Sequence, residues 1–441
     1  MKTASNNRIL IYTPLVTSRL NYIFNFVFFE QLGVSCDFCS GIEEFKTANE
    51  YKFSYSTEDL FPDIPFIEAN GLLQEENIKN FKIETFVFEN QKAFFRTSVR
   101  SFFPFDMFSA SFYLLSRYEE YLPSRPDKHG RYRPEESMAY KENFLEEPVI
   151  DAWIIEFKKY LLRQFPALKV KHKKFRYLPT IDIDNAFADL HKGILRTSLS
   201  LLKLSLLFNF RSLMDKIKVL SYLKRDDYDQ FDYFEQIHSQ KGIKPIYFIL
   251  YSKYGRYDKN LPRKNKEFIA LIKKIASNHE IGIHPSYQSH KSLKIIEREK
   301  TELESIIGRK ITKSRQHFLK LSLPETYSNL TKLKIDSDYT MGYASMPGFR
   351  AGTCSTFNFF DLKKNAETQL KIFPLALMDA TFIYYLKYNT DEAIKKIIKI
   401  VKAVKNVEGI LVTLWHNENL GEDWKKVYEI MLNEVESRNT L

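Results

Sequence analysis

Residues 176–184, RYLPTIDID, decide the fold of this 441-residue chain. The stretch reads as a buried β-strand that ends in two aspartates, Asp182 and Asp184, separated by one isoleucine. Because side chains alternate along a strand, both carboxylates point to the same side. Two carboxylates this close repel each other unless a positive charge lies beside them. A divalent cation held by one of them would leave the other free as a base.

Three later apolar runs also end in chemically active side chains. These strand-like runs span residues 281–283, 310–314 and 410–415. They lead into imidazoles and a guanidinium at His284, Arg315, His317 and His416. Helical apolar spacing separates the runs, for example over residues 265–278. Repeated β/α units favour a barrel or an open parallel sheet, in which chemistry collects at the carboxyl ends of the strands. The pattern therefore indicates a metal-assisted hydrolytic site.

The sequence that precedes residue 176 predicts a smaller α/β domain. Its first elements are expected in the order strand, helix, strand, at residues 8–12, 18–33 and 34–39. Apolar spacing predicts a further, buried helix over residues 105–122. A basic stretch at residues 169–176 then precedes the strand that ends in the paired aspartates. We therefore expect an N-terminal domain of residues 1–170 and a C-terminal domain of residues 171–441.

The amino-acid composition limits the kinds of binding partner and the cellular compartment that we expect. The net charge of +11 is spread over many lysines interleaved with acids, which favours a solvated surface over nucleic-acid binding. Only three cysteines occur, so a disulfide framework is not expected. Cys36 and Cys39 form a single CxxC that reads as part of a strand. No signal peptide and no apolar run of about 18 residues are apparent. These features predict a cytoplasmic protein.

Residues 196–223 form a basic amphipathic insertion after the paired aspartates. Its apolar stripe recurs at helical spacing, at Leu199, Leu202, Leu206, Leu213, Ile217 and Leu220, and five Lys and Arg residues lie on the remaining surface. We favour packing of this stripe on the protein itself or on a partner subunit, although the sequence does not decide an oligomeric state. The alternative is peripheral contact with a membrane surface.

The ordered motifs resemble those of the polysaccharide deacetylase family, carbohydrate esterases whose catalytic unit is the NodB-homology domain. Asp182 and Asp184 match the catalytic base and a metal-binding aspartate of the family's first motif, and His279–His284 matches the second motif. Arg315 matches the arginine that holds the base. The segment Leu414–His416 matches the last motif, which ends in the general acid.

The resemblance covers residues from about 171 to 441, and the segments before it resemble a bacterial subgroup with an extra N-terminal domain. It implies a distorted (β/α) barrel preceded by the smaller α/β domain. It also implies a hydrolase of carbon–nitrogen bonds that removes acetyl groups from an N-acetylated sugar or polysaccharide, including a lipid-linked precursor. A divalent metal, Zn²⁺ by expectation, would activate water. Asp182 would take the proton, Arg315 would orient Asp182, and His416 would protonate the departing amine.

One position departs from the family pattern. The second metal-binding histidine should fall at residue 288, which is Gln288 here. His317 lies two residues after Arg315 and would point the same way on a strand. We therefore prefer Asp184, His284 and His317 as the metal ligands, with Gln288 or His290 as alternatives.

Three further residues have open roles. Asp338 and Asp379 are candidates to orient an imidazole. Arg350 could contact substrate or form a structural ion pair.

Two other functions compete with deacetylation. A glycosidase could use Asp182 and Asp184 as its acid pair, because adjacent residues on one face of a strand bring carboxyls about 5 Å apart. That reading leaves the three histidines without a role. A decayed deacetylase-like module that binds glycans or a membrane surface is the non-enzymatic alternative, motivated by Gln288 and the basic insertion.

Overall fold

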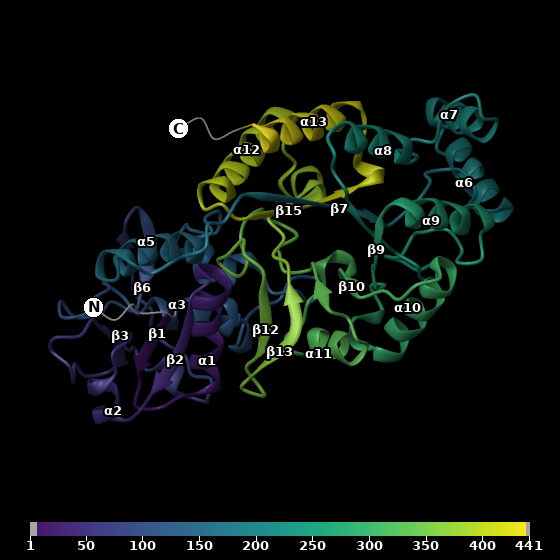
Figure 1. The fold of residues 1–441 in the computed structure, drawn as a ribbon. Coiled ribbons are helices and arrows are strands. Elements are labelled where there is room, and N and C mark those ends of the chain that lie inside the picture. Colours follow the sequence, from purple (N-terminus) through teal and green to yellow (C-terminus); the bar gives the residue numbers. More distant parts are fainter. Residues whose placement is uncertain (1–6, 438–441) are drawn as a thin grey trace.

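The computed structural model describes residues 7–437 and contains two main parallel sheets (Figure 1). The first sheet has the strand order β2-β1-β3-β4. Its strands are β1 (Arg8–Tyr12), β2 (Ser35–Cys39), β3 (Tyr51–Ser56) and β4 (Phe66–Glu68). Every pairing within it is parallel. The β-α-β order predicted for the start of the chain is therefore confirmed, and Cys36 and Cys39 lie on β2 with free thiols.

The second sheet contains the strand that decides the fold. Its order is β12-β13-β11-β10-β9-β8-β7-β15-β14. The strands are β7 (Arg176–Ile183), β8 (Ile246–Ile249), β9 (Glu280–Ile283), β10 (Lys313–Ser314), β11 (Ser337–Asp338), β12 (Phe357–Asp361), β13 (Ala366–Ile372), β14 (Leu377–Met378) and β15 (Ile410–His416). Among the described pairings within this second sheet, only that of β12 with β13 is antiparallel. Pairing runs from β12 at one edge to β14 at the other, so the described strands form an open sheet and not a closed barrel.

Helices surround the second sheet on its outer side. They are α8 (Phe231–Gln240), α9 (Lys266–Asn278), α10 (Leu293–Ile307), α11 (Glu325–Lys332), α12 (Thr390–Asn406) and α13 (Glu422–Glu436). In Figure 1, α12, α13 and α8 lie along the top of the view, and α9, α10 and α11 follow along the right and lower side. Helix α12 begins with a capping box between Asn389 and Glu392.

The N-terminal part has shorter helices than its apolar pattern predicts. They are α1 (Ser18–Phe24), continued by a π-helix over Asn25–Leu32, α2 (Ile42–Thr47), α3 (Met107–Leu115), α4 (Met138–Lys141) and α5 (Val149–Gln164), with a hairpin of β5 (Thr85–Phe88) and β6 (Gln91–Phe94). The helix expected over residues 105–122 ends at Leu115, because Arg117 adopts a left-handed backbone with φ 54°. The buried guanidinium of Arg117 pairs with Glu119 and Glu120, which holds the chain in this turn.

One hydrophobic core joins residues from both parts of the chain. Phe360 on β12 packs edge-on against Phe112 of α3, with ring centroids 5.0 Å apart, and also contacts Tyr22 of α1. Arg350 forms a buried ion pair with Glu120 at 2.6 Å, so its structural role is the one observed. The domain boundary near residue 170 stays a prediction, because packing is continuous across it.

None of the helices between residues 7 and 437 combines the length and the apolarity needed to cross a bilayer. Residues 1–6, which contribute to the prediction that no signal peptide precedes the chain, lie outside the described residues.

Candidate metal centre

Neighbouring strand ends bring the predicted residues to one edge of the second sheet. Strand β7 lies between β8 and β15, and Asp182 is in register with His416. Asp184 follows β7 directly, and His284 follows β9. Arg315 follows β10, where its backbone N–H donates to the carbonyl of Ile283. The buried, apolar strands leave their carboxyl ends as the place where polar side chains can converge.

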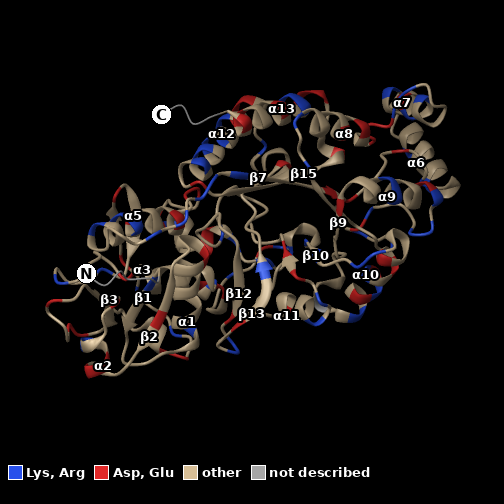
Figure 2. Cartoon of the chain, viewed as in Figure 1, with Lys and Arg blue, Asp and Glu red and all other residues tan. Residues whose placement is uncertain are grey.

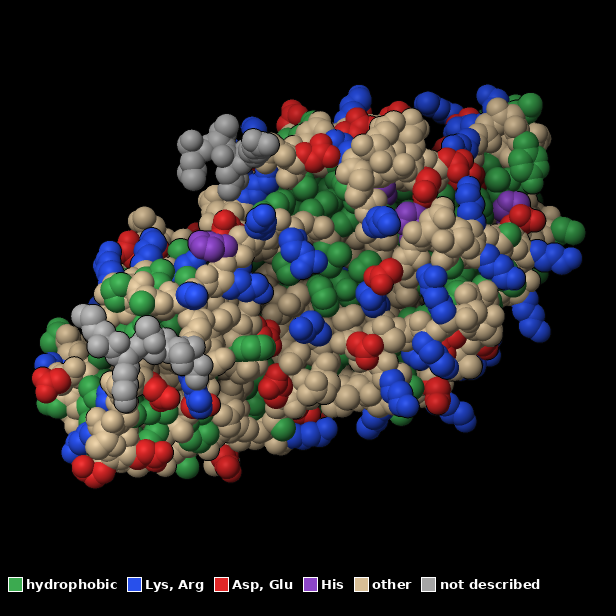
Figure 3. Space-filling view, in the orientation of Figure 1, with side chains coloured by type: hydrophobic (Ala, Val, Ile, Leu, Met, Phe, Trp, Pro, Cys, Tyr) green, Lys and Arg blue, Asp and Glu red, His purple; other side chains and the backbone are tan. Residues whose placement is uncertain are grey.

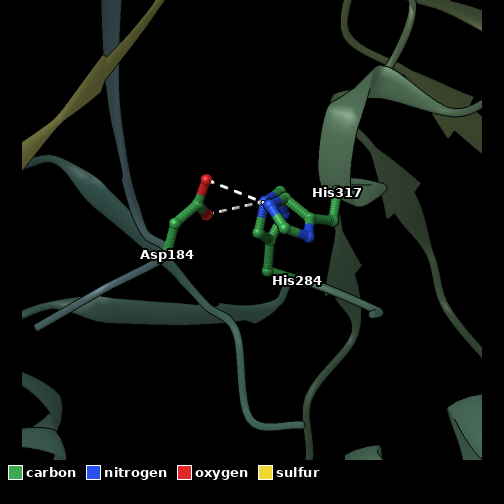
Figure 4. Close-up of side chains that lie close together, drawn as sticks. All are labelled: Asp184, His284 and His317. Atoms are coloured by element: carbon green, nitrogen blue, oxygen red, sulfur yellow. Dashed lines mark hydrogen bonds and ion pairs between the residues drawn. The ribbon is translucent and has the colours of Figure 1, made fainter. Parts of the chain in front are cut away.

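Asp184, His284 and His317 form the centre of this site (Figure 4). His284 Nε2 lies 3.1 Å from Asp184 Oδ1, and His317 Nε2 lies 3.1 Å from Asp184 Oδ2. The ligand atoms that the three side chains offer all lie within 4.8 Å of one another. Both imidazoles are buried, and together with the carboxylate they converge on a single point.

The second nitrogen of each imidazole is fixed by an acceptor. His284 Nδ1 donates to the backbone carbonyl of Arg315 at 2.6 Å, and His317 Nδ1 donates to Asp258 Oδ1 at 2.9 Å. Because a carbonyl can only accept, His284 in its neutral form presents an Nε2 lone pair to Asp184. A carboxylate facing two lone pairs is repelled by them unless a cation or a proton lies between. Asp184 Oδ1 is also buried without a hydrogen-bond partner. One carboxylate and two imidazoles are ligand types that suit Zn²⁺, so these residues fit a divalent metal.

The pKa shifts of Asp184 and His317 also indicate that this site favours positive charge. Burial on its own would raise the pKa of Asp184, but His317 and His284 hold that pKa well below its usual range. Burial on its own would lower the pKa of His317, but Asp184 and Asp258 raise it to about 9. A proton on His317 thus takes the place that a metal cation would occupy beside Asp184.

Asp182 lies beside this group and is held from behind by Arg315. The guanidinium donates from Nη1 to Asp182 Oδ1 at 2.8 Å and to Thr180 Oγ1 at 2.6 Å. Its Nε donates to the carbonyl of Tyr339 at 3.0 Å. Arg315 is fully buried, and its position is therefore fixed. The other oxygen of Asp182, Oδ2, faces His284 Nε2 at 3.6 Å.

His416 completes the group from β15. Its Nε2 is 3.8 Å from Asp184 Oδ2, and its Nδ1 is 2.6 Å from Asp379 Oδ1. Asp379 also accepts from the backbone N–H of His416 at 2.8 Å. Burial on its own would lower the pKa of His416, but Asp379 and the two strand-end aspartates raise it to about 10. His416 is therefore held as a proton donor with its free edge towards the cavity.

The group opens into a cavity of about 380 Å³. The wall includes Tyr384 and Tyr385 from the π-helix over Thr381–Leu386, and both side chains are exposed. The N-terminal part contributes Lys128, His129 and Arg131 to the wall. Arg131 donates to the carbonyl of Phe318 at 2.7 Å, which fastens its loop to the segment that carries His317.

All six residues expected from the sequence meet here, while the alternative ligands lie elsewhere. His290 lines a separate cavity next to α11, with Ser322 and Glu325. Gln288 precedes a short 3₁₀ turn outside the wall of the main cavity. The prediction that His317 lies on the same strand as Arg315 was wrong. Strand β10 ends at Ser314, and His317 begins a 3₁₀ turn in which Phe318 has φ 61°.

Of the two candidate orienting acids, Asp379 holds His416, and Asp338 accepts from Ser314 Oγ and Thr340 Oγ1 instead. Two further acids at the site, Asp258 and Glu418, were not predicted from the sequence. Burial and Asp184 raise the pKa of Glu418 to about 7. Asp258 stands in a polar loop, Lys253–Asn260, whose sequence carries no motif that would indicate contact with an imidazole.

Among the family models, one matches the N-terminal part of the chain. Residues 9–166 match a family of unknown function, DUF7033. The match ends before the strand that carries the paired aspartates. The chain matches no curated protein.

Three solved structures illustrate what this chain is similar to. A protein from Mycobacterium smegmatis, assigned as a polysaccharide deacetylase, is 15% identical over 61% of this chain and 86% of its own, with a TM-score of 0.39. A CE4 family pseudoenzyme from Bacillus anthracis is 10% identical over 59% of this chain and 60% of its own, at 0.31. The polysaccharide deacetylase Bc1974 from Bacillus cereus is 12% identical over 60% and 87%, at 0.28. Because these TM-scores are low, the similarity carries no argument about the function of this chain.

Proposed function

We propose that this protein is a metal-dependent hydrolase that removes acetyl groups from an N-acetylated sugar. The observation that carries the proposal is the convergence of His284 Nε2 and His317 Nε2 on the two oxygens of Asp184, each at 3.1 Å. The proposal extends to the fold. We assign the second sheet, which stays open between β12 and β14, to the distorted barrel type of the polysaccharide deacetylases. Three free thiols support a reducing, cytoplasmic location for the chain.

Asp184, His284 and His317 would hold the divalent ion, for which Zn²⁺ is the expected identity. When bound, such an ion polarises the acyl carbonyl and makes a water molecule nucleophilic near neutral pH. Asp258 and the carbonyl of Arg315 orient the two imidazoles for this purpose, in the manner of the outer ligands of many metal sites.

Asp182 takes the proton from the attacking water. Arg315, which also donates to Thr180 Oγ1, fixes the oxygen Oδ1 on the far side, and this leaves Oδ2 as the basic atom facing the cavity. A base acts only within hydrogen-bond reach of the proton that it removes, so this fixed orientation is its main contribution.

His416 donates a proton to the amine as the carbon–nitrogen bond breaks. Asp379 holds its Nδ1–H, so the Nε2–H is the proton directed into the cavity. A glycosidase reading fits this arrangement less well. Asp184 would need a raised pKa to act as an acid, whereas the two imidazoles hold that pKa low.

The cavity supports a saccharide substrate. Its volume of about 380 Å³ suits a sugar residue, and the exposed rings of Tyr384 and Tyr385 offer flat surfaces for the apolar face of a pyranose. Arg131 is buried and paired with Asp127, but the exposed Lys128 adds positive charge to the wall, which would favour a sugar that carries a phosphate or carboxylate.

Acetate release from a panel of N-acetylated saccharides, measured with and without a chelator, tests the proposal. We expect release that stops after chelation and returns when Zn²⁺ or another divalent ion is added back. Release of new reducing ends without acetate would favour the glycosidase. A protein that binds the saccharides and releases neither product would be the decayed module.

Removing the charge of Asp379 is expected to move the alkaline limb of the pH profile. Asp379 raises the pKa of His416, so activity that requires protonated His416 persists at low pH and is lost as pH rises through that pKa. In Asp379→Asn the pKa falls, and the alkaline limb of kcat/KM shifts to lower pH while the acid limb stays in place. An unchanged alkaline limb in this variant would contradict the role of His416 as the acid.

A further inference from the structure

Helices α6 (Ile194–Leu206) and α7 (Phe210–Leu220) form a hairpin with an exposed apolar surface. Among the described residues, 12 of the 24 exposed large hydrophobic side chains lie between Ile194 and Leu223. Helix α6 has no buried residue. Figure 3 shows hydrophobic side chains gathered with Lys and Arg at the upper right, where Figure 1 places this hairpin. Such a concentration on a soluble fold indicates a binding surface.

The exposed side chains form one stripe on each helix. On α6 the stripe consists of Leu195, Leu199, Leu202 and Leu206, and on α7 of Phe210, Met214 and Ile217. The spacing of three or four residues keeps each set on one face. Leu207 and Phe208, in the turn between the helices, are 64% and 77% exposed and continue the surface. The apolar side chains therefore form a continuous outward face.

Positive charge borders this face. Residues 194–225 contain seven Lys and Arg residues and one acid, Asp215. Each stripe has flanking cations one position after an exposed apolar residue, at Arg196, Lys203, Arg211 and Lys218. Figure 2 shows Lys and Arg, in blue, along α6 and α7. An apolar stripe edged by cations matches an interface of acyl chains below anionic headgroups.

The hairpin is fixed to the body of the protein by its inner side. Lys216 Nζ bonds Asp189 Oδ1 at 2.5 Å and Ser200 Oγ at 2.8 Å. Asp226, which follows the hairpin, accepts from the backbone N–H groups of Asp189 and Leu190 at 2.8 and 2.9 Å. The outward direction of the apolar face is thus built into the fold.

The base of the hairpin lies at the same sheet edge as the candidate metal centre. The guanidinium of Arg196 lies over the ring of Tyr254, 4.2 Å from its centroid, in the loop that follows β8. In that loop, Asn260 donates to the carbonyl of Ile183 at the end of β7, and Asp258 holds His317. A surface bound through the hairpin therefore lies near the mouth of the cavity.

We propose that the α6–α7 hairpin docks the protein on a membrane surface that carries anionic phospholipids. The charge pattern favours this occupant over a second copy of the chain. A symmetric contact between two hairpins would bring the cations that border one face against those of the other. Resting on the proposed function, docking at this edge presents the cavity to an N-acetylated sugar held at the membrane by a lipid carrier.

Sedimentation with phospholipid vesicles tests the docking without reference to catalysis. We expect the protein to bind vesicles of phosphatidylcholine mixed with phosphatidylglycerol, to bind phosphatidylcholine alone weakly, and to dissociate as salt rises. Arg211→Glu with Lys218→Glu should weaken binding by about tenfold or more, because each cation near the surface contributes to the attraction. Met214→Glu should do the same by placing a charge in the apolar stripe.

Matched controls separate a local effect from net charge. Lys395→Glu with Lys402→Glu makes the same change in charge on the exposed face of α12 and should leave binding nearly intact. Val99→Glu, at a fully exposed apolar residue outside the hairpin, is the control for Met214→Glu. Equal loss in the hairpin and control variants would overturn the proposal, as would absence of binding to anionic vesicles. Hairpin variants that convert a dimer to a monomer would assign the face to a second copy.

The docking and the chemistry can fail separately. Asp182→Asn alters the candidate base and leaves the hairpin untouched, so it should bind vesicles as the unmodified protein does. Vesicle binding without acetate release would refute the proposed function alone. Release from soluble saccharides without vesicle binding would refute the docking alone.

Discussion

Asp182→Asn is expected to lower kcat by about 10³-fold while the protein keeps its metal. The change removes a base and preserves the shape of the side chain, and the candidate ligands Asp184, His284 and His317 are unaltered. Arg315 can still donate to the amide oxygen at the position of Oδ1, so the buried guanidinium keeps one partner there and one at Thr180. Single-turnover kinetics and metal content measured on the same preparation would check both parts.

Asp338→Asn is a matched control for this variant. Asp338 is also a buried aspartate at a strand end of the same sheet, on β11, but its carboxylate accepts from Ser314 and Thr340. We expect that change to lower thermal stability and to leave the turnover of the folded protein near its original value. Near-normal turnover in Asp182→Asn combined with loss in Asp338→Asn would place the base at Asp338.

Most residues of the candidate site could be predicted from the sequence, because each strand end is marked by the point where an apolar run stops. The bounds of β7 and β15 follow from apolar runs that stop at Asp182 and His416, and parallel pairing then brings those ends together. Helix α9, with its regular apolar face and the cap at Asn265, was equally predictable. Local pattern and tertiary position agree at these elements.

Other features depended on contacts that no local pattern records. Arg117 leaves the helical conformation because two neighbouring glutamates bind its guanidinium inside the core. Asp258 reaches His317 across 59 residues of sequence, from a loop without regular structure. Likewise Lys128, His129 and Arg131 reach the cavity from the N-terminal part through packing between distant segments. Such contacts are set by the assembled fold.

His317 lies beside Asp184 and His284 as predicted, but not on the strand that the prediction assumed. Its spacing from Arg315 suggested a shared strand, but the chain leaves the strand before either residue. The ring is directed by Asp258 on one side, while the loop held by Arg131 lies against Phe318, the next residue. Its role as a metal ligand stays a prediction.

His317→Ala is expected to lower metal affinity by about 10²-fold or more, with partial recovery of activity in excess Zn²⁺. Two ligands, Asp184 and His284, would remain, and the Asp184 carboxylate would keep only one imidazole facing it. Competition with a chromogenic chelator measures the affinity directly.

His290→Ala is the matched control for His317→Ala, because it removes an imidazole that lines a different cavity, and its metal affinity should stay unchanged. Asp258→Asn should have a smaller effect than His317→Ala, since it weakens the orientation of the ring and leaves the ligand in place. Unchanged affinity in His317→Ala, together with a lower melting temperature, would make that ring a structural residue. The metal centre would then need a third ligand from outside the Asp184, His284 and His317 group.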